Sequence, residues 1–305
     1  MLQLFTSFIK SYEEQQLGQL LENEPLKKHT TFRVGGPARV FVIPNSKDSL
    51  IKTMELIKHY QLNAKVIGKG SNLLPSDQEF KGVVVKCDKG LDYVKVEGKI
   101  VTAGAGVSTV SLANKVAKLG FSGLEFVSGV PGTIGGAVYM NAGAYNKEMK
   151  NVLIKALIID ELGQLRWLNN EEFHFDYRTS IMQYHKEWII VEAVLELEDG
   201  NYQDIMDLMK MRKLRRRESQ PLNMPSAGST FRNPLPHASW KLIEGAGLRG
   251  MSIGGAEVSE KHCNFIVNKG DATAADILEL IRYVQKVVFE NYEIELHLEV
   301  EMFNW

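Results

Sequence analysis

The segment SGVPGTIGGAVYMNAGAY, residues 128–145, restricts the possible folds of this chain more than any other stretch. Glycine allows positive φ angles and a close approach of the backbone to a ligand. Such clustering indicates backbone N–H groups turned inward to hold an anion, and a pyrophosphate fits best. The glycines of this segment, which lie among small residues and almost no charge, are Gly129, Gly132, Gly135, Gly136 and Gly143.

A flexible loop is the alternative interpretation of the same glycines. Flexible linkers are rich in serine and polar residues. This segment and its flank instead carry apolar side chains that need burial, among them Val127, Ile134, Val138 and Met140. A buried cofactor cradle is therefore the favoured prediction.

Further glycine clusters lie upstream. GKGSNLL, residues 68–74, follows a short apolar run, but Leu73 stands where a dinucleotide fingerprint needs its last glycine. GAGVST at 104–109 fails the same test, and no segment has the lysine-ending pattern of a nucleoside-triphosphate loop. Together with Gly35 and Gly36, these clusters predict a dinucleotide held between loops of a non-Rossmann fold.

The bulk composition excludes several classes of protein. With 305 residues, 44% of them hydrophobic, the chain can bury a sizeable core in two or three lobes. The net charge of −1 offers no general attraction to nucleic acid or anionic membranes. No early apolar run is long enough for a signal or membrane segment. Cys87 and Cys263 lie far apart without metal-ligand spacing. We therefore expect a cytoplasmic protein without a metal site and without nucleic-acid or membrane partners.

Hydrophobic periodicity predicts an α+β chain. Helices are expected at 7–23, 46–60, 108–119, 204–217 and 273–292, the last with Thr273 and Asp276 as its start signal. Strands are expected at 38–43, 64–68, 82–87, in a hairpin at 93–103, in three runs within 152–197, at 263–267 and at 294–303. Compositional changes near Asp88 and Gly200 predict three parts, residues 1–88, 89–200 and 201–305.

Three polar residues stand in contexts that local propensity does not explain. They are Arg178 in FDYRTS, Ser229 in SAGSTFRNP and Glu299 in ELHLEVEMF. From spacing alone, each has an ordinary explanation: a paired surface arginine, a turn serine and an outward-facing glutamate. The basic run at 210–217 is likewise typical of a solvated helix face, with a phosphate contact as the alternative.

The motifs around these residues resemble the UDP-N-acetylenolpyruvoylglucosamine reductase family, flavoproteins of bacterial cell-wall precursor synthesis. The matching motifs are HTTFRVGGPA, GKGSNLL, SGVPGTIGGAVYMNAGAY, YRTS, PSAGSTFRNP, GLRG with GGAEVSEKHCNFIVN, and LHLEVEMF. They occur in the family's order from residue 29 to the end of the chain. The resemblance implies a two-lobed vanillyl-alcohol-oxidase-type FAD-binding fold, with lobes at 1–88 and 89–200, and a C-terminal α/β substrate-binding domain at 201–305.

The resemblance also implies an activity. NADPH would reduce non-covalently bound FAD, which would pass a hydride to UDP-N-acetylglucosamine enolpyruvate and form UDP-N-acetylmuramate for peptidoglycan synthesis. Arg178 and Glu299 match the family residues that stabilise the developing enolate. Ser229 matches the serine that protonates the α-carbon.

Binding residues follow from the same resemblance. The substrate pocket would be lined by Tyr177, Arg232 and Asn233, with Asn233 at the diphosphate. A helix near 138–145 would present its backbone to the FAD pyrophosphate, and Cys263 is interpreted as packing. The oligomeric state stays open, with a monomer as the expectation. The expected cofactor-binding residues are Gly68, Gly70, Ser71, Asn72, Leu73, Gly129, Gly132, Thr133, Gly135, Gly136, Ala142 and Gly143.

Two features differ from part of the family. Only 50 residues separate Arg178 from Ser229, too few for the tyrosine-bearing loop of type I members, so a type II enzyme is expected and the covering of the substrate stays open. Ser219 replaces the lysine that usually precedes the Gln-Pro pair. One basic residue among Arg215, Arg216 and Arg217 is expected to meet the phosphate instead.

Two other functions compete with the reductase. An FAD-dependent oxidase on the same scaffold is the main one, but neither GKGSNLL nor the SGVPG loop holds the histidine or cysteine that tethers flavin in many such enzymes. A nucleotide-sugar binding or regulatory protein is the other. The joint presence of Arg178, Ser229 and Glu299 argues against a loss of catalysis.

Overall fold

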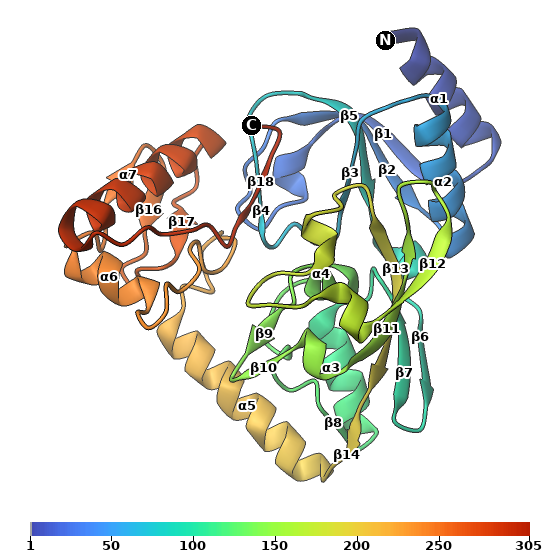
Figure 1. Cartoon of the computed structure of the whole chain (residues 1–305). Coiled ribbons are helices and arrows are strands. Elements are labelled where there is room, and N and C mark those ends of the chain that lie inside the picture. The colour runs from blue at the N-terminus through green and yellow to red at the C-terminus, as the bar shows by residue number, and fades with distance from the viewer. Residues whose placement is uncertain (1) are drawn as a thin grey trace. The chain divides into compact units, whose positions relative to one another are not determined.

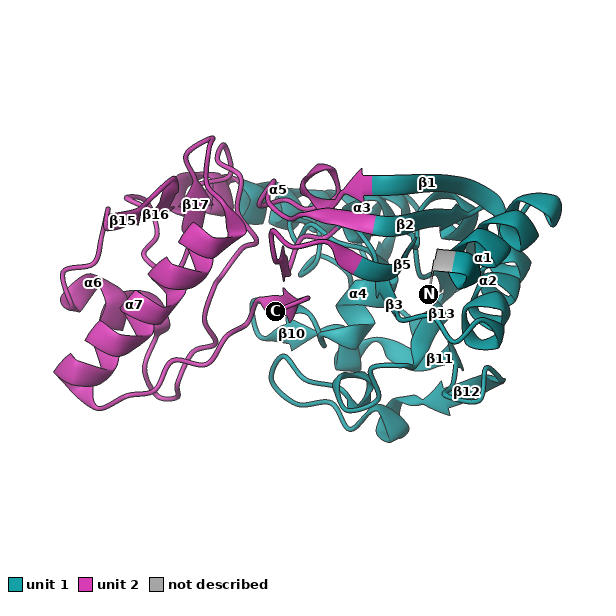
Figure 2. Ribbon diagram, turned by 90° about the horizontal axis from the view of Figure 1, so that it is seen from above, with its two compact units in different colours: residues 1–23, 39–69, 81–213 teal, residues 24–38, 70–80, 214–305 magenta. Residues whose placement is uncertain are grey.

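The computed structural model describes residues 2–305, which form two compact units (Figures 1 and 2). Unit 1 contains the described residues within 1–23, 39–69 and 81–213, and unit 2 contains 24–38, 70–80 and 214–305. The chain passes repeatedly from one unit to the other, so neither unit is a continuous segment. The predicted division into three consecutive parts, with boundaries at residues 88 and 200, is not tested by these two discontinuous units and stays a prediction.

The first sheet of unit 1 has the strand order β1–β2–β5–β3, with α1 and α2 side by side next to it (Figure 1). Its core strand β5 contains three fully buried valines, Val83 to Val85, as expected for a strand that is covered on both faces. Ser46 caps α2 by accepting the backbone N–H of Ser49. The elements are α1 (Leu2–Glu14), β1 (Gly18–Pro25), β2 (Pro37–Pro44), α2 (Lys47–His59), β3 (Ala64–Ile67) and β5 (Phe80–Lys86).

The second sheet of unit 1 is antiparallel and has the order β12–β11–β13–β7–β6. Its central strand β13 is buried along almost its whole length, and α4 packs against it. Its elements are β6 (Val94–Glu97), β7 (Ile100–Gly104), β11 (Leu153–Ile159), β12 (Leu165–Asn169) and β13 (Ile189–Glu196). Helices and short pairs complete the unit: α3 (Thr109–Lys118), α4 (Ile134–Tyr139), β8 (Phe121–Ser122) with β14 (Glu198–Asp199), and β9 (Gly143–Ala144) with β10 (Lys147–Glu148).

Unit 2 is built around the long helix α7, which packs on a three-stranded antiparallel sheet and on α6 (Figure 2). Strands β4 and β18 form a separate parallel pair. The long helix α5 begins in unit 1 and ends in unit 2. The elements are β4 (Leu73–Pro75), α5 (Tyr202–Ser219), α6 (Ser239–Gly245), β15 (Ser252–Ile253), β16 (Ala256–Val258), β17 (Ile266–Asn268), α7 (Ala274–Tyr292) and β18 (Glu301–Phe303).

Single helical turns also occur, at η1 (Leu26–Lys28), η2 (Lys89–Leu91), η3 (Met149–Asn151), η4 (Asn170–Phe173) and η5 (Ile181–Gln183). Each unit has its own hydrophobic interior: among the described residues, two core clusters lie within unit 1 and one lies within unit 2. Cys263 is buried in the core of unit 2, as its interpretation as a packing residue requires. Within residues 2–305, no helix combines the length and hydrophobicity that a membrane span needs.

Two predicted elements near the chain ends are wrong. The helix expected at 7–23 ends at Glu14, because Gln16 adopts a left-handed φ of 52° and Gly18 begins β1. A side chain at Gly18 would lie 2.2 Å from the carbonyl oxygen of Ile43, so the strand approaches its neighbour closely. The strand expected at 294–303 is reduced to β18. The backbone before β18 bonds to the side chain of Asn72 and to the loop at Thr230, and it forms no continuous strand pairing.

Two others are shifted. The helix expected near 138–145 is α4, which ends at Tyr139 because Asn141 adopts a left-handed φ of 42° and the chain turns into β9. The strand expected at 263–267 starts only at Ile266, since Phe265 donates its N–H to the carbonyl of His262 in a turn. The hairpin at 93–103 and the helix start at Thr273 are confirmed.

Candidate functional site

Three glycine-containing segments meet in unit 1. A side chain at Gly68 would lie 2.5 Å from Oγ1 of Thr133, and one at Gly135 would lie 2.8 Å from Cβ of Ala105. Thr109 donates its hydroxyl to the carbonyl of Val130 over 2.6 Å. The segments 68–69, 104–109 and 130–136 therefore pack so closely that glycine is required at their contacts.

The backbone groups of this region divide into two sets. Gly135 N–H and Gly136 N–H bond to Ala105 O and Thr133 Oγ1, so they serve the fold. Gly132 N–H and Thr133 N–H have no hydrogen-bond partner among residues 2–305. Nearby, Lys69 donates its ammonium to Ser108 Oγ over 2.7 Å. Open N–H groups next to a cation suit a pyrophosphate, so these residues fit the expected FAD.

Arg178 occupies a tight turn in unit 1. The backbones of Asp176 and Thr179 exchange hydrogen bonds of 3.1 and 3.0 Å, and Arg178 lies between them with φ +57°. A positive φ is unusual for a side chain of this kind and is often found at functional sites. The arginine is half-buried, and its Nη2 donates to the carbonyl of Gly143 over 2.8 Å. Its guanidinium also lies 5.0 Å from the ring centre of Tyr177.

Ser229 and Glu299 meet in unit 2. The segment 229–232 pairs antiparallel with 297–300 through an isolated bridge between Phe231 and Leu298. Glu299 N–H donates to Thr230 O over 2.9 Å, and Arg232 N–H donates to His297 O over 2.8 Å. Both Ser229 and Glu299 are half-buried. The two residues thus lie on neighbouring segments although 70 positions separate them in the sequence.

The GKGSNLL motif supplies the next contact in unit 2. Asn72 donates its side-chain amide to Glu299 O over 2.8 Å, and its backbone carbonyl accepts the N–H of Glu301 over 2.9 Å. Gly70 has φ +60°, and a side chain there would lie 2.2 Å from the carbonyl oxygen of His29. Gly70, Ser71, Asn72 and Leu73 therefore belong to unit 2, whereas Gly68 belongs to unit 1.

The loop that carries Ser229 is fixed by a residue that the sequence did not single out. Asn264 is buried and both accepts from Phe231 N–H and donates to Phe231 O, over 3.0 and 2.8 Å. Its own N–H donates to Nδ1 of His262 over 3.3 Å. Burial lowers the pKa of His262, so the imidazole is neutral at neutral pH and can accept this bond.

The expected substrate residues are divided between the units. Tyr177 is exposed in unit 1, and Arg232 and Asn233 are in unit 2. Asn233 accepts the N–H of Ser239 through Oδ1 over 3.0 Å, which leaves its NH₂ group as the donor for a ligand. Arg216 donates Nε to the side chain of Gln220 over 2.9 Å at the end of α5.

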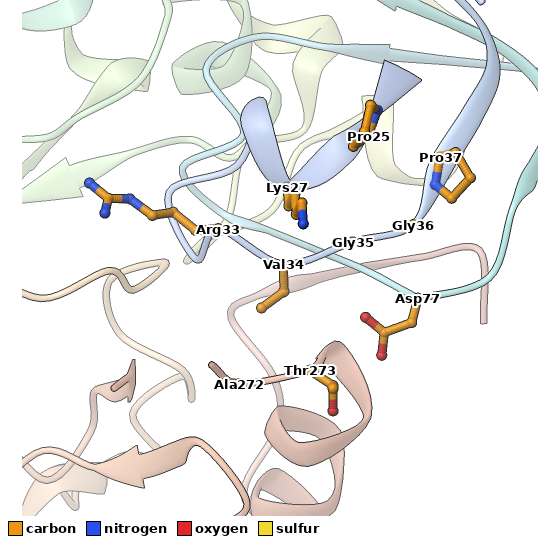
Figure 3. Close-up of a pocket in the computed structure, with 10 residues that line it drawn as sticks. All are labelled: Pro25, Lys27, Arg33, Val34, Gly35, Gly36, Pro37, Asp77, Ala272 and Thr273. Carbon is orange, nitrogen blue, oxygen red and sulfur yellow. The ribbon is translucent and has the colours of Figure 1, made fainter. Parts of the chain in front are cut away.

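A cavity of about 400 Å³ also lies within unit 2 (Figure 3). Both carboxylate oxygens of Asp77 accept backbone N–H groups at the start of α7, from Ala274 and Ala275 at 3.0 Å each. The side chain of Arg33 points away from Asp77 in Figure 3. The cavity thus borders a capped helix end, which explains the acid there without a ligand. Its lining residues are Pro25, Lys27, Arg33, Val34, Gly35, Gly36, Pro37, Asp77, Ala272 and Thr273.

Comparison with protein families supports the resemblance of the motifs. A profile of the C-terminal domain of UDP-N-acetylenolpyruvoylglucosamine reductase matches residues 220–303, and a profile of an FAD-binding domain matches residues 38–169. UDP-N-acetylenolpyruvoylglucosamine reductase of Bacillus licheniformis is 50% identical over 294 residues, which cover 96% of this chain and 97% of that protein.

Solved structures agree with this similarity. The crystal structure of UDP-N-acetylenolpyruvylglucosamine reductase from Thermus caldophilus matches with a TM-score of 0.81 and 33% identity, covering 94% of this chain and 98% of that one. Berberine bridge enzyme from Eschscholzia californica matches with a TM-score of 0.50 and 14% identity, over 64% of this chain and 44% of that one. The expected fold, a vanillyl-alcohol-oxidase-type FAD-binding part with a separate C-terminal domain, is confirmed.

Proposed function

The chain belongs to the UDP-N-acetylenolpyruvoylglucosamine reductase family, and from this premise we propose that it reduces UDP-N-acetylglucosamine enolpyruvate to UDP-N-acetylmuramate. The observation that carries the proposal is the retention of Arg178, Ser229 and Glu299 within the family's motifs. When bound, FAD would supply a hydride, two electrons and one proton derived from NADPH, to the terminal carbon of the enolpyruvyl double bond. The remaining chemistry falls to the side chains of this protein.

Arg178 is proposed to stabilise negative charge. Reduction of the terminal carbon places electron density on the substrate carboxylate as an enolate develops. A guanidinium next to that oxygen stabilises the negative charge far more strongly in a water-poor site than in bulk water. The turn at 176–179 fixes the backbone of Arg178, and the bond to Gly143 O orients its guanidinium.

Ser229 and Glu299 are proposed to complete the reaction. Ser229 would donate its hydroxyl proton to the α-carbon and regain a proton from solvent. This proton, together with the hydride added at the terminal carbon, would saturate the double bond. An alcohol is a weak acid, but a positioned one suffices against a strongly basic carbon. Glu299 would contribute a hydrogen bond to the developing enol, and its backbone is fixed by Thr230 and Asn72.

The cofactor and substrate positions follow from the same premise. Lys69, Gly132 and Thr133 are proposed to hold the FAD pyrophosphate, while Asn233 and one arginine of 215–217 are proposed to hold the substrate diphosphate. Since NADPH and nucleotide sugars are cytoplasmic reactants, we propose a cytoplasmic enzyme. We also propose that it acts as a monomer.

Two observations decide between the reductase and an oxidase. The purified protein should be yellow, and its NADPH consumption should depend on added UDP-N-acetylglucosamine enolpyruvate and yield UDP-N-acetylmuramate. Acid precipitation should release all flavin into the supernatant, because neither glycine loop carries a tethering histidine or cysteine. NADPH consumption that depends on oxygen alone would instead identify the oxidase.

A further inference from the structure

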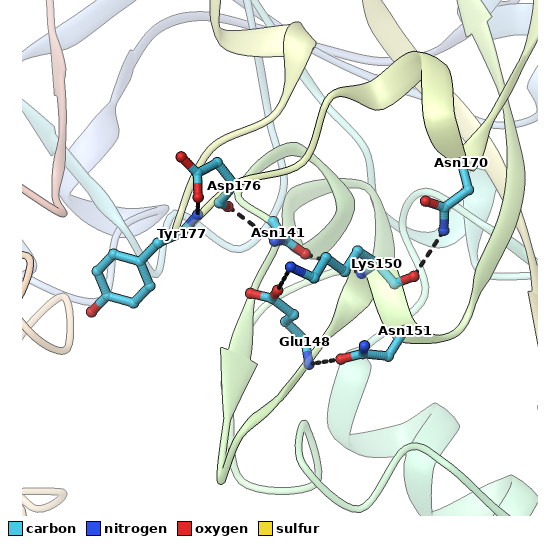
Figure 4. Close-up of polar contacts among 7 residues, drawn as sticks. All are labelled: Asn141, Glu148, Lys150, Asn151, Asn170, Asp176 and Tyr177. Carbon is cyan, nitrogen blue, oxygen red and sulfur yellow. Dashed lines mark hydrogen bonds and ion pairs between the residues drawn. The ribbon is translucent and has the colours of Figure 1, made fainter.

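The turn that carries Arg178 is attached to the short segment 139–143, which follows α4. Ser180 donates its hydroxyl to Tyr139 O over 2.6 Å, and Arg178 itself donates to Gly143 O over 2.8 Å. Asn141 donates its side-chain amide to Asp176 O over 3.0 Å (Figure 4). The turn is therefore bonded to this loop at three places: at its first residue Asp176, at Arg178, and at Ser180, which follows the turn.

Asn141 also links the turn to a third segment. Its side chain is completely buried, and its Oδ1 accepts the backbone N–H of Lys150 over 3.0 Å. The amide thus spans from Asp176 to Lys150 with its donor and its acceptor both used (Figure 4). Its φ of +42° also favours asparagine over most other side chains.

We propose that Asn141 is a positioning residue that holds the Arg178 turn on the loop containing the predicted cofactor residues Ala142 and Gly143. The inference rests on the proposed function, because it assigns Asn141 an effect that passes through Arg178. Asp176 is exposed, so its carbonyl can bond to water once the amide of Asn141 is lost. Loss of the amide would therefore let the turn shift, and a misplacement of about 1 Å can slow a reaction about 10²-fold.

Two variants separate the side chain from the backbone. Asn141→Asp keeps the size but replaces the donor with an oxygen that faces the Asp176 carbonyl. Asn141→Gly accepts the positive φ without strain and removes both bonds. The matched control is Asn170→Ala, since Asn170 donates to Lys150 O and Leu153 O from the far side and does not touch the turn (Figure 4).

The test measures each half-reaction and the motion of the turn. In both Asn141 variants, substrate-driven re-oxidation of reduced flavin should slow by about 10- to 10²-fold. Reduction by NADPH and the FAD dissociation constant, measured by flavin fluorescence, should stay close to the parent values. Amide hydrogen exchange in residues 174–182 should rise in the Asn141 variants and not in Asn170→Ala.

A double mutant identifies the route of the effect. Combined with Arg178→Ala, the Asn141→Gly change should slow re-oxidation no further, because both substitutions remove the same interaction. Additive losses, or equal losses in both half-reactions, would overturn the proposal, as would unchanged exchange in residues 174–182. If the parent flavin is not re-oxidised by the substrate at all, the proposed function fails, while hydrogen exchange still decides whether Asn141 holds the turn.

Discussion

At the scale of single residues, Arg178 has a strained backbone conformation, with φ +57°. A turn with positive φ at its third position normally takes glycine, and a larger residue there is strained by about 1–3 kcal/mol. The hydrogen bonds from Ser180 to Tyr139 O and from Asn141 to Asp176 O keep the turn in place in spite of this strain. Such strain is expected to persist where the side chain is needed for function.

Arg178→Gly should therefore be more stable than Arg178→Ala by about 1 kcal/mol, since only glycine adopts the turn without strain. Both variants lose the guanidinium, so both should turn over substrate far more slowly than the parent. Urea denaturation measures the stability difference and steady-state kinetics measures the activity. A glycine variant that is less stable than the alanine variant would contradict the strain.

Ser229→Ala tests the proposed acid. The variant should bind FAD and be reduced by NADPH at nearly the parent rate, because the serine acts only after electrons reach the substrate. Re-oxidation of the flavin by substrate should slow by about 10²–10⁴-fold, the usual contribution of a positioned general acid. Stopped-flow absorbance follows each half-reaction. Failure of flavin reduction with normal re-oxidation would remove this role from Ser229.

The candidate residues differ in how far the sequence could predict them. Arg178, Ser229 and Glu299 emerged only from the resemblance of the surrounding motifs, since spacing alone favoured ordinary explanations. Asn141 and Asn264 were not singled out as site residues. Their importance comes from the bonds that these buried asparagines make to segments 35 and 33 positions away, and a single asparagine carries no sequence signal for such partners.

At the scale of elements, prediction succeeded where one segment contains its own signal. The buried run of β13 and the capped start of α7 are examples. Prediction failed where a distant partner decides. Residues 294–300 alternate like a strand, but their backbone bonds to Asn72 and to the Ser229 loop, so no ladder forms before Glu301.

The start of α7 yields a prediction on stability. Thr273 accepts the N–H of Asp276, and Asp276 in turn accepts the N–H of Thr273, which lowers the pKa of the Asp276 carboxyl. Thr273→Ala should cost about 1 kcal/mol in the free energy of unfolding, whereas Thr273→Ser should keep the cap and cost much less. Thermal or urea unfolding at neutral pH measures both, and equal losses in the two variants would rule out the cap.

The same carboxylate makes this cap sensitive to acid. Because the folded pKa of Asp276 lies below its ordinary value of 3.8, its contribution is complete above that pH and is lost as the pH falls through the folded pKa. Asp276→Asn should therefore be less stable than the parent at neutral pH, and the difference should vanish in strong acid. A difference that is constant with pH would show that charge plays no part.

At the scale of the whole molecule, the resemblance predicted the fold and the local patterns did not. Periodicity marks where strands occur, but the orders β1–β2–β5–β3 and β12–β11–β13–β7–β6 depend on pairing between segments far apart in the chain. The chain also alternates between two units, and the proposed catalytic residues are shared, with Arg178 in one and Ser229 and Glu299 in the other. No composition change along the sequence reveals that alternation.

The most direct test of the reductase is a single-turnover experiment without oxygen. The flavin of the purified protein is reduced with NADPH, and UDP-N-acetylglucosamine enolpyruvate is then mixed in while the flavin absorbance is followed. We predict that the oxidised spectrum returns and that one UDP-N-acetylmuramate forms for each flavin. A flavin that stays reduced with this substrate and re-oxidises only when oxygen is admitted would contradict the account.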